Sequence, residues 1–235
     1  MHAVPAATGA VASLVLLTAP AHAAIDATFV EGDANAADFF FADSEQAVAE
    51  ARYGDSGGNA TWEVGVGADT QNPPDFDQAN KAWTPGASEA FTLFYDVSET
   101  ELTFTVGGTT VDYTLDSPLT VNDIAIRIAF GSGSGAGNGN AASLNTLAIG
   151  GTPLSPSSLT STFDESGAKY LFVQDAFAFG DDFTLTGNLI FDWSDVDPNL
   201  RGSRPAFQVK FVDVIPEPAS LAILAAGLTA IFRRR

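Results

Sequence analysis

A pair of alternating segments around two glycines constrains the fold of this chain more than any other feature. In residues 101–106, and again in residues 109–115, apolar residues fall at every second position. That period is typical of strands with one buried face. Gly107 and Gly108 between them predict a two-residue hairpin turn, because such turns need positive φ values. The segment therefore indicates two neighbouring antiparallel strands.

Other short apolar segments, separated by turn-forming residues, extend this pattern along the chain. Further strands are expected at Thr61–Val66, Phe91–Tyr95, Ile124–Phe130, Leu144–Ile149, Tyr170–Val173, Phe183–Trp193 and Phe207–Val214. One helix is expected at Ser44–Arg52, where Ala47, Val48 and Ala51 would share a side. Many short strands predict an all-β fold, a jelly-roll or lectin-like β-sandwich with one short helix.

Two residue types that carry much of enzyme chemistry are missing from the middle of the chain. There is no cysteine, and the two histidines, His2 and His22, lie near the N-terminus. Without thiol or imidazole, most zinc, copper and haem sites and most nucleophile–base pairs are excluded. We therefore expect no enzyme and no cofactor, with calcium as the one alternative.

The charge of the chain is strongly negative. All 29 acidic residues lie in residues 24–217, and three of the ten basic residues are the arginines at the C-terminus. Seven basic residues thus remain against 29 acidic ones, a formal charge of −22 for that segment. Such a charge argues against nucleic acid or an anionic membrane as a partner.

The N-terminus has the features of a cleaved signal peptide. An apolar stretch at residues 10–19 is followed by Ala21, His22 and Ala23, an A-x-A cleavage site. The region before the apolar stretch has no Lys or Arg, which departs from the usual pattern and would fit a misplaced start codon. Cleavage after Ala23 would leave a body that begins near Ala24.

The C-terminus consists of three distinct parts. Pro216, Glu217 and Pro218 form a stiff segment that cannot join a helix or a central strand. Residues 219–232 are uncharged and would form a hydrophobic helix of about 21 Å, shorter than the roughly 30 Å core of a bilayer. The final residues, Arg233, Arg234 and Arg235, would stay on the cytoplasmic face of the membrane. A transient inner-membrane anchor fits this better than a permanent span; a helix packed on the body is the alternative.

These three parts, in this order, resemble the PEP-CTERM sorting signal of exported bacterial proteins. The resemblance implies processing by the membrane protease exosortase after passage through the general secretion machinery. It also implies transient anchoring followed by release to the cell surface or the extracellular space. The expected organisation is a signal peptide at residues 1–23, a β-sandwich at residues 24–214 and a sorting signal at residues 215–235.

The body itself is similar to the choice-of-anchor ectodomains, in particular the W type. The segments that carry this resemblance are residues 62–65, 91–96, 102–108 and 144–150. These families are defined without a known activity, so the resemblance implies a surface location but no catalytic or ligand-binding residue.

Two sequence patterns suggest hydrolytic chemistry but lack the partners that it needs. Residues 54–58, Gly-Asp-Ser-Gly-Gly, match the nucleophile segment of trypsin-like proteases, yet Ser56 has no histidine to act as its base. Glu63, and the pair Glu99 and Glu101, are candidate acids for a glycosidase. A glycine-rich turn and a solvated strand face explain them better.

Calcium and carbohydrate are the two ligands that the sequence leaves open. Asp192, Asp195, Asp197 and Asn199 resemble the start of a calcium loop, although Leu200 stands where such a loop needs glycine. Ordinary turn residues are the alternative interpretation. Trp83 lies in a polar segment and is the best candidate for stacking on a sugar ring.

Together these features predict an exported, acidic β-sandwich protein with a structural or adhesive role at the cell surface or in the extracellular matrix. The alternative is a carbohydrate-binding module, calcium-dependent in one version, with exopolysaccharide as its partner.

Overall fold

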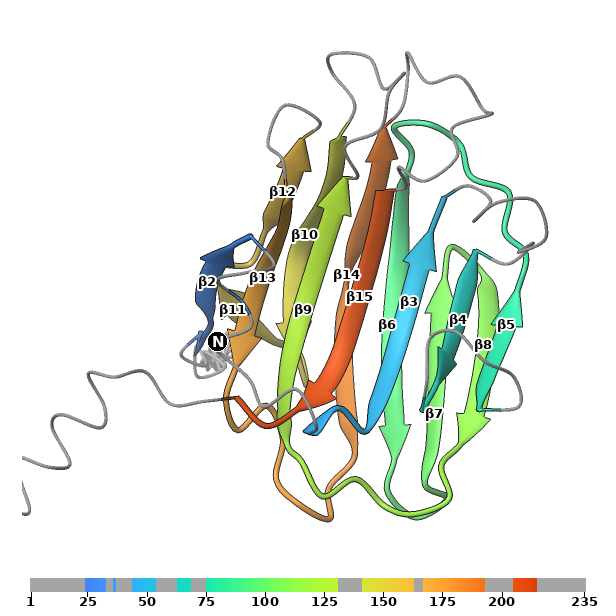
Figure 1. The fold of residues 1–235 in the computed structure, drawn as a ribbon, viewed down its shortest axis with the longest axis vertical. Coiled ribbons are helices and arrows are strands. Elements are labelled where there is room, and N and C mark those ends of the chain that lie inside the picture. Colours follow the sequence, from blue (N-terminus) through green and yellow to red (C-terminus); the bar gives the residue numbers. More distant parts are fainter. Residues whose placement is uncertain are drawn as a thin grey trace, which may run out of the picture.

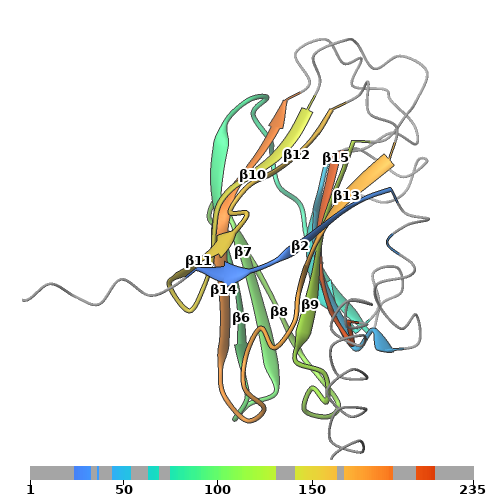
Figure 2. The same cartoon turned by 90° about the vertical axis from the view of Figure 1, so that its left-hand side faces the viewer.

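The computed structural model describes residues 24–32, 36, 44–53, 63–68, 75–130, 141–162, 167–192 and 205–214. These residues form fifteen strands in two sheets that face each other (Figures 1 and 2). The strands are β1 (Ile25–Asp26), β2 (Thr28–Glu31), β3 (Ala47–Arg52), β4 (Val64–Gly67), β5 (Phe76–Ala79), β6 (Ser88–Asp96), β7 (Glu101–Val106), β8 (Thr109–Thr114), β9 (Asp123–Phe130), β10 (Ala141–Ile149), β11 (Thr152–Ser155), β12 (Leu159–Thr162), β13 (Gly167–Val173), β14 (Phe183–Asp192) and β15 (Pro205–Val212).

The order of the strands confirms the expected all-β sandwich. The first sheet runs β1-β11-β10-β14-β6-β7-β8, with β12 also paired to β10. The second sheet runs β2-β13-β9-β15-β3-β4-β5 and lies in front in Figure 1. Neighbouring strands are antiparallel, except that β1 pairs with β11 in parallel.

The glycine hairpin forms as its sequence predicts. Val106 pairs with Thr109 across the turn, and Gly107 and Gly108 have φ values of 52° and 83°. Both values are positive, and residues other than glycine adopt such φ values only with strain. The other strands expected from the sequence are also present, with ends that differ by a few residues. The short strands β1, β2, β5, β11 and β12 were not expected.

Aromatic side chains from both sheets meet in the core. The ring centroids of Phe91 on β6 and Phe207 on β15 are 4.7 Å apart, and those of Phe183 and Phe211 are 5.4 Å apart. All four side chains are almost fully buried. Burial of one such side chain stabilises the fold by about 1.5–3 kcal/mol, so these contacts hold the two sheets together.

The helix expected at Ser44–Arg52 is wrong, because residues 47–52 form strand β3. This strand pairs with β15 on one side and with β4 on the other, and all six of its residues are buried. Ala47, Ala49 and Ala51 face the core, directly across from the large side chains of β15. Small residues fit between the sheets there, and a helix would leave the backbone groups of β4 and β15 unpaired.

The outer face of the second sheet carries a row of hydrogen-bonded polar side chains. Tyr170, Arg127, Gln208 and Glu50 lie side by side on β13, β9, β15 and β3. Arg127 donates from Nε to the Tyr170 hydroxyl at 3.0 Å and from Nη1 to Gln208 Oε1 at 3.2 Å. Gln208 Nε2 donates to Glu50 Oε2 at 2.8 Å, and Arg52 Nη1 lies 3.9 Å from Glu50 Oε1.

This polar row favours one alignment of the four strands. Glu50 and Arg52 are only 6% and 9% exposed, so water cannot readily replace a hydrogen-bond partner that either of them loses. A shift of one residue in any strand would move its member to the opposite face. The row therefore specifies the register of the sheet.

Candidate functional sites

The place where the chain leaves the sandwich is fixed by side chains. Strand β15 ends at Val212, and Val214 is buried against the outer face of the second sheet. The backbone N–H of Val214 donates to Asp123 Oδ2 at 2.8 Å, and that of Asp213 donates to Ser44 Oγ at 2.8 Å. The chain is thus fixed to the sandwich as far as Val214, where the C-terminal segment starts.

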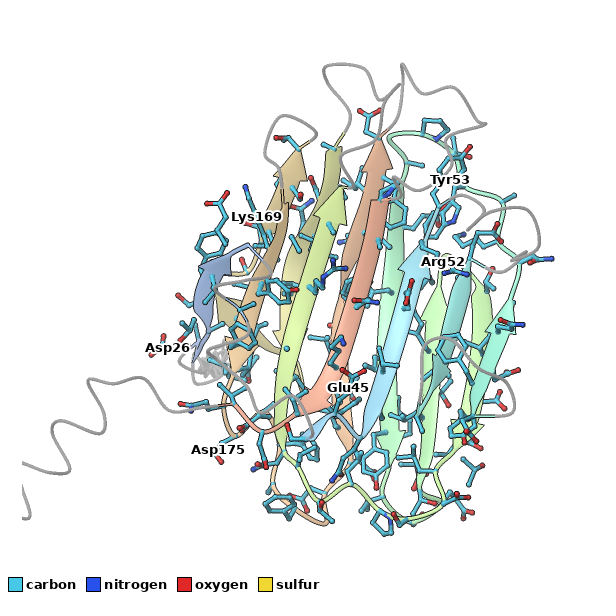
Figure 3. All side chains as sticks on the ribbon, in the orientation of Figure 1. Asp26, Glu45, Arg52, Tyr53, Lys169 and Asp175 are labelled. Atoms are coloured by element: carbon cyan, nitrogen blue, oxygen red, sulfur yellow. The ribbon has the colours of Figure 1, made fainter. Side chains whose placement is uncertain are left out.

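Asp123 is the central residue of this junction. Its other carboxylate oxygen accepts a hydrogen bond from the backbone N–H of Asp175 at 2.7 Å. Burial raises the pKa of Asp123 above its usual value, although the two N–H donors act against this shift. The nearby carboxylates of Asp175 and Asp213 raise the pKa further. Figure 3 shows Asp175 at the lower end of the sandwich.

All the residues to which the sequence assigns a role in sorting lie outside the described part of the chain. This holds for Pro216, Glu217, Pro218, Arg233, Arg234, Arg235, Ala21 and Ala23, and also for the Gly-Asp-Ser-Gly-Gly segment that contains Ser56. Their assignments stay predictions.

Only one of the four residues in the calcium hypothesis lies in the described part of the chain. Asp192 is the last residue of β14 and pairs with Ala141 of β10, while Asp195, Asp197 and Asn199 fall outside the described residues. Within the described ranges, no three Asp, Glu, His or Cys side chains are grouped so that they could hold a metal ion. Calcium binding at Asp192 stays a prediction.

Trp83 is a packing residue as well as a candidate ligand platform. Its indole N–H donates to the carbonyl oxygen of Arg52 at 2.9 Å, and its ring centroid lies 4.8 Å from that of Phe191. Lys81 Nζ lies 5.0 Å from the centroid of the indole ring and 3.4 Å from Glu89 Oε1. Trp83 is half-buried, and its role as a ligand platform stays a prediction.

The carboxylates considered for glycoside hydrolysis lie in separate structural settings. Glu63 Oε2 accepts a hydrogen bond from the backbone N–H of Lys81 at 2.9 Å and so fastens the segment before β4 to the segment after β5. Glu99 is exposed in the turn between β6 and β7, and Glu101 begins β7.

A pocket at one end of the sandwich was not foreseen from the sequence. Its volume is about 430 Å³, within the range of roughly 300–1,000 Å³ that small-molecule sites occupy. Its polar lining consists of Gln46, Asp75, Tyr113, Asp116, Ser117 and Thr120. These residues come from three separate segments of the chain, so no local pattern could have revealed the pocket.

The C-terminal segment matches a known motif. Residues 214–235 match the PEP-CTERM protein-sorting motif, which confirms the resemblance of this segment to an exosortase sorting signal. The motif implies an exported protein that is processed by exosortase and transiently anchored at its C-terminus. It begins at Val214, the residue that Asp123 binds.

No curated protein matches the chain. The similarity of the body to choice-of-anchor ectodomains therefore stays a prediction. In the part of the chain that the structure describes, no helix is both long and apolar enough to cross a bilayer.

Proposed function

We propose that this chain is a structural or adhesive protein of the bacterial cell surface or extracellular matrix, delivered there by exosortase. The observation that carries the proposal is the sorting motif at residues 214–235, which follows directly on a β-sandwich. In this arrangement the sandwich is the delivered cargo. The motif acts as an address that is cut off near Pro216 and Pro218, while the final arginines keep the uncut tail on the cytoplasmic side.

The role proposed for the sandwich is binding or scaffolding rather than catalysis. Residues 24–217 have no histidine and no cysteine, and their formal charge of −22 suits a hydrated surface layer. A carbohydrate-binding role with exopolysaccharide as the partner, with or without calcium, is the second candidate. The pocket beside Tyr113 favours it, because the pocket combines an aromatic ring with carboxylate and hydroxyl groups.

Replacement of Pro216, Glu217 and Pro218 by alanine tests the sorting proposal. In the native host we expect the variant to keep its C-terminal segment and to stay with the inner membrane, as shown by intact mass and by cell fractionation. Pro85→Ala, in an exposed turn of the body, is the control and should be processed normally. Normal processing of the triple variant would contradict the proposal.

A screen of the processed protein against glycan and peptide substrates tests the non-catalytic role. We expect no turnover. An activity that Glu63→Gln or Ser56→Ala abolishes would show that the body is a hydrolase.

A further inference from the structure

The pocket lies at the edge where the two sheets come together. Asp75 precedes β5 of the second sheet, and Tyr113 lies near the end of β8 in the first sheet. Near this point the backbone N–H of Asp112 donates to Asp77 Oδ2 at 3.4 Å, which links the two edge strands directly. Tyr113 points inward, on the same side of β8 as the buried Val111, and packs against the core while staying half-buried.

The wall of the pocket formed by residues 115–120 is held in place at three points. The backbone N–H of Leu115 donates to the carbonyl oxygen of Thr100 at 2.9 Å. That of Leu119 donates to the hydroxyl of Tyr95, a core residue, at 3.2 Å, and that of Thr120 donates to Gln46 Oε1 at 2.7 Å. A wall fixed in this way loses little conformational freedom when a ligand binds.

Two carboxylates, those of Asp75 and Asp116, give the pocket a negative charge. Within the described ranges, neither Asp75 nor Asp116 accepts a side-chain hydrogen bond or lies in an ion pair. Burial raises the pKa of the Tyr113 hydroxyl, and the carboxylates of Asp75 and Asp116 raise it further. The negative charge of both carboxylates therefore acts at the position of the Tyr113 hydroxyl. This environment favours a ligand with a positive charge.

The chemistry of the lining favours an organic cation over a metal ion. The described lining offers two carboxylates, and no three Asp, Glu, His or Cys side chains in the described ranges are grouped to hold a metal ion, whereas a protonated amine needs only a few acceptors. The half-buried ring of Tyr113 provides an apolar surface for a sugar ring, and the hydroxyl of Ser117 can exchange hydrogen bonds with sugar hydroxyls.

The pocket lies at the end of the sandwich from which the sorting motif departs. The backbone N–H of Gln46, a lining residue, donates to the carbonyl oxygen of Phe211 at 3.0 Å, three residues before the motif begins. Glu45, the neighbour of Gln46, lies at the lower end of β3 and β15 in Figure 3.

We propose that this pocket binds an amino-sugar unit of a surface polysaccharide through its free, positively charged amine. The inference rests on the proposed function and deepens its second candidate by naming the class of glycan. Asp75 and Asp116 bind the ammonium group, Tyr113 packs against the sugar ring and Ser117 bonds to a hydroxyl group.

Isothermal titration of the full-length chain in detergent tests this binding with two matched probes. A hexamer of glucosamine carries free amines, and a hexamer of N-acetylglucosamine has the same backbone with the amines blocked. We expect the first to bind at least about tenfold more tightly, and to weaken as salt is added. Equal binding of the two hexamers, or no binding of either, would overturn the proposal.

Variants of the lining locate the binding. Asp75→Asn with Asp116→Asn should weaken binding of the glucosamine hexamer about tenfold or more. Asp26→Asn with Asp181→Asn removes the same charge from exposed positions outside the pocket and should change binding less than about twofold. Tyr113→Phe should bind nearly as well as the unmodified chain, and Tyr113→Ala should bind weakly. Circular dichroism checks that each variant is folded, and equal losses in the two double variants would refute the assignment.

A lysine hexapeptide separates the glycan from a basic protein partner. Tighter binding of this peptide than of the glucosamine hexamer would overturn the proposal in favour of a protein ligand. The sorting test at Pro216–Pro218 does not involve the pocket. If the triple alanine variant is processed normally while the glucosamine hexamer still binds, the proposed delivery is rejected and the proposed binding in the pocket stands. If processing is blocked but the hexamer does not bind, only the proposed binding in the pocket is rejected.

Discussion

The pKa values of Asp96 and Asp123 are shifted in opposite directions by their surroundings. Asp96 is the last residue of β6, and its Oδ1 accepts hydrogen bonds from the hydroxyl of Ser98 at 2.7 Å and from the backbone N–H groups of Ser98 and Glu99. The Ser98 hydroxyl makes the largest contribution that lowers the pKa of Asp96. At Asp123, which is half-buried, desolvation outweighs two backbone hydrogen bonds and raises the pKa. Ionisation is therefore favoured in the turn and disfavoured at the junction.

Asp96→Asn should lower stability at neutral pH and have little effect in acid. Because the pKa of Asp96 is lowered by folding, its ionised form contributes stability that is fully present above the usual value of about 3.9. That contribution is lost as the pH falls through the lowered pKa. Urea unfolding midpoints of the two proteins between about pH 2 and pH 7 measure this. A difference that does not change with pH would contradict the assignment.

Asp123→Asn should show the opposite dependence on pH. Folding raises the pKa of Asp123, so its contribution is present below the usual value of about 3.9 and is lost as the pH rises through the raised pKa. We expect the original chain to lose stability relative to the variant over that interval. An NMR titration of the Asp123 carboxyl carbon should give a midpoint above about 3.9, and a midpoint below it would refute the cause that we assign.

The strands differ in how far the sequence alone could predict them. In β7 and β8 apolar and polar residues alternate, and Gly107-Gly108 joins the two strands, so the local sequence is sufficient to predict this hairpin. In β3 both faces are buried, which removes the alternation, and its alanines equally suit a helix. The four-residue strands β5, β11 and β12 exist because a neighbour pairs with them.

The candidate sites divide in the same way. The sorting segment is continuous in sequence and could be recognised directly. The pocket could not be recognised from the sequence. Gln46 and Asp75 lie next to strands of the second sheet and Tyr113 lies on a strand of the first, so they come together only when the two sheets pack against each other.

Glu50→Ala tests the polar row across the second sheet. Removal of the carboxylate leaves Gln208 without its acceptor and Arg52 without its nearby charge, at a cost of about 1–3 kcal/mol in the free energy of unfolding. Glu50→Gln keeps an acceptor for Gln208 and should cost less. Glu99→Ala, at an exposed position, is the control, and urea unfolding measures all three. A Glu50→Ala variant as stable as the control would contradict the role of the row.

At the scale of the whole molecule, the last strand of the described chain occupies the centre of a sheet. β15 pairs with β9 over residues 205–212 and with β3 over residues 206–211. Phe207 and Phe211 on this strand also provide core contacts to the first sheet. Both halves of the second sheet therefore depend on a segment that is far from them in sequence.

Truncation on either side of this strand should have opposite results. A chain of residues 24–214 should fold like the complete body, whereas a chain of residues 24–204 should lack the second sheet, because β9 and β3 lose their common neighbour. Circular dichroism and resistance to proteolysis distinguish the two. A folded, protease-resistant chain that ends at residue 204 would show that β15 is dispensable.

The central position of β15 has a consequence for a polypeptide that crosses a membrane with its N-terminus first. Residues 205–212 reach the far side almost last, and the sorting motif begins only two residues after them. Until then the translocated part cannot close its second sheet. The last strand that the second sheet needs and the start of the sorting motif therefore reach the far side at almost the same moment.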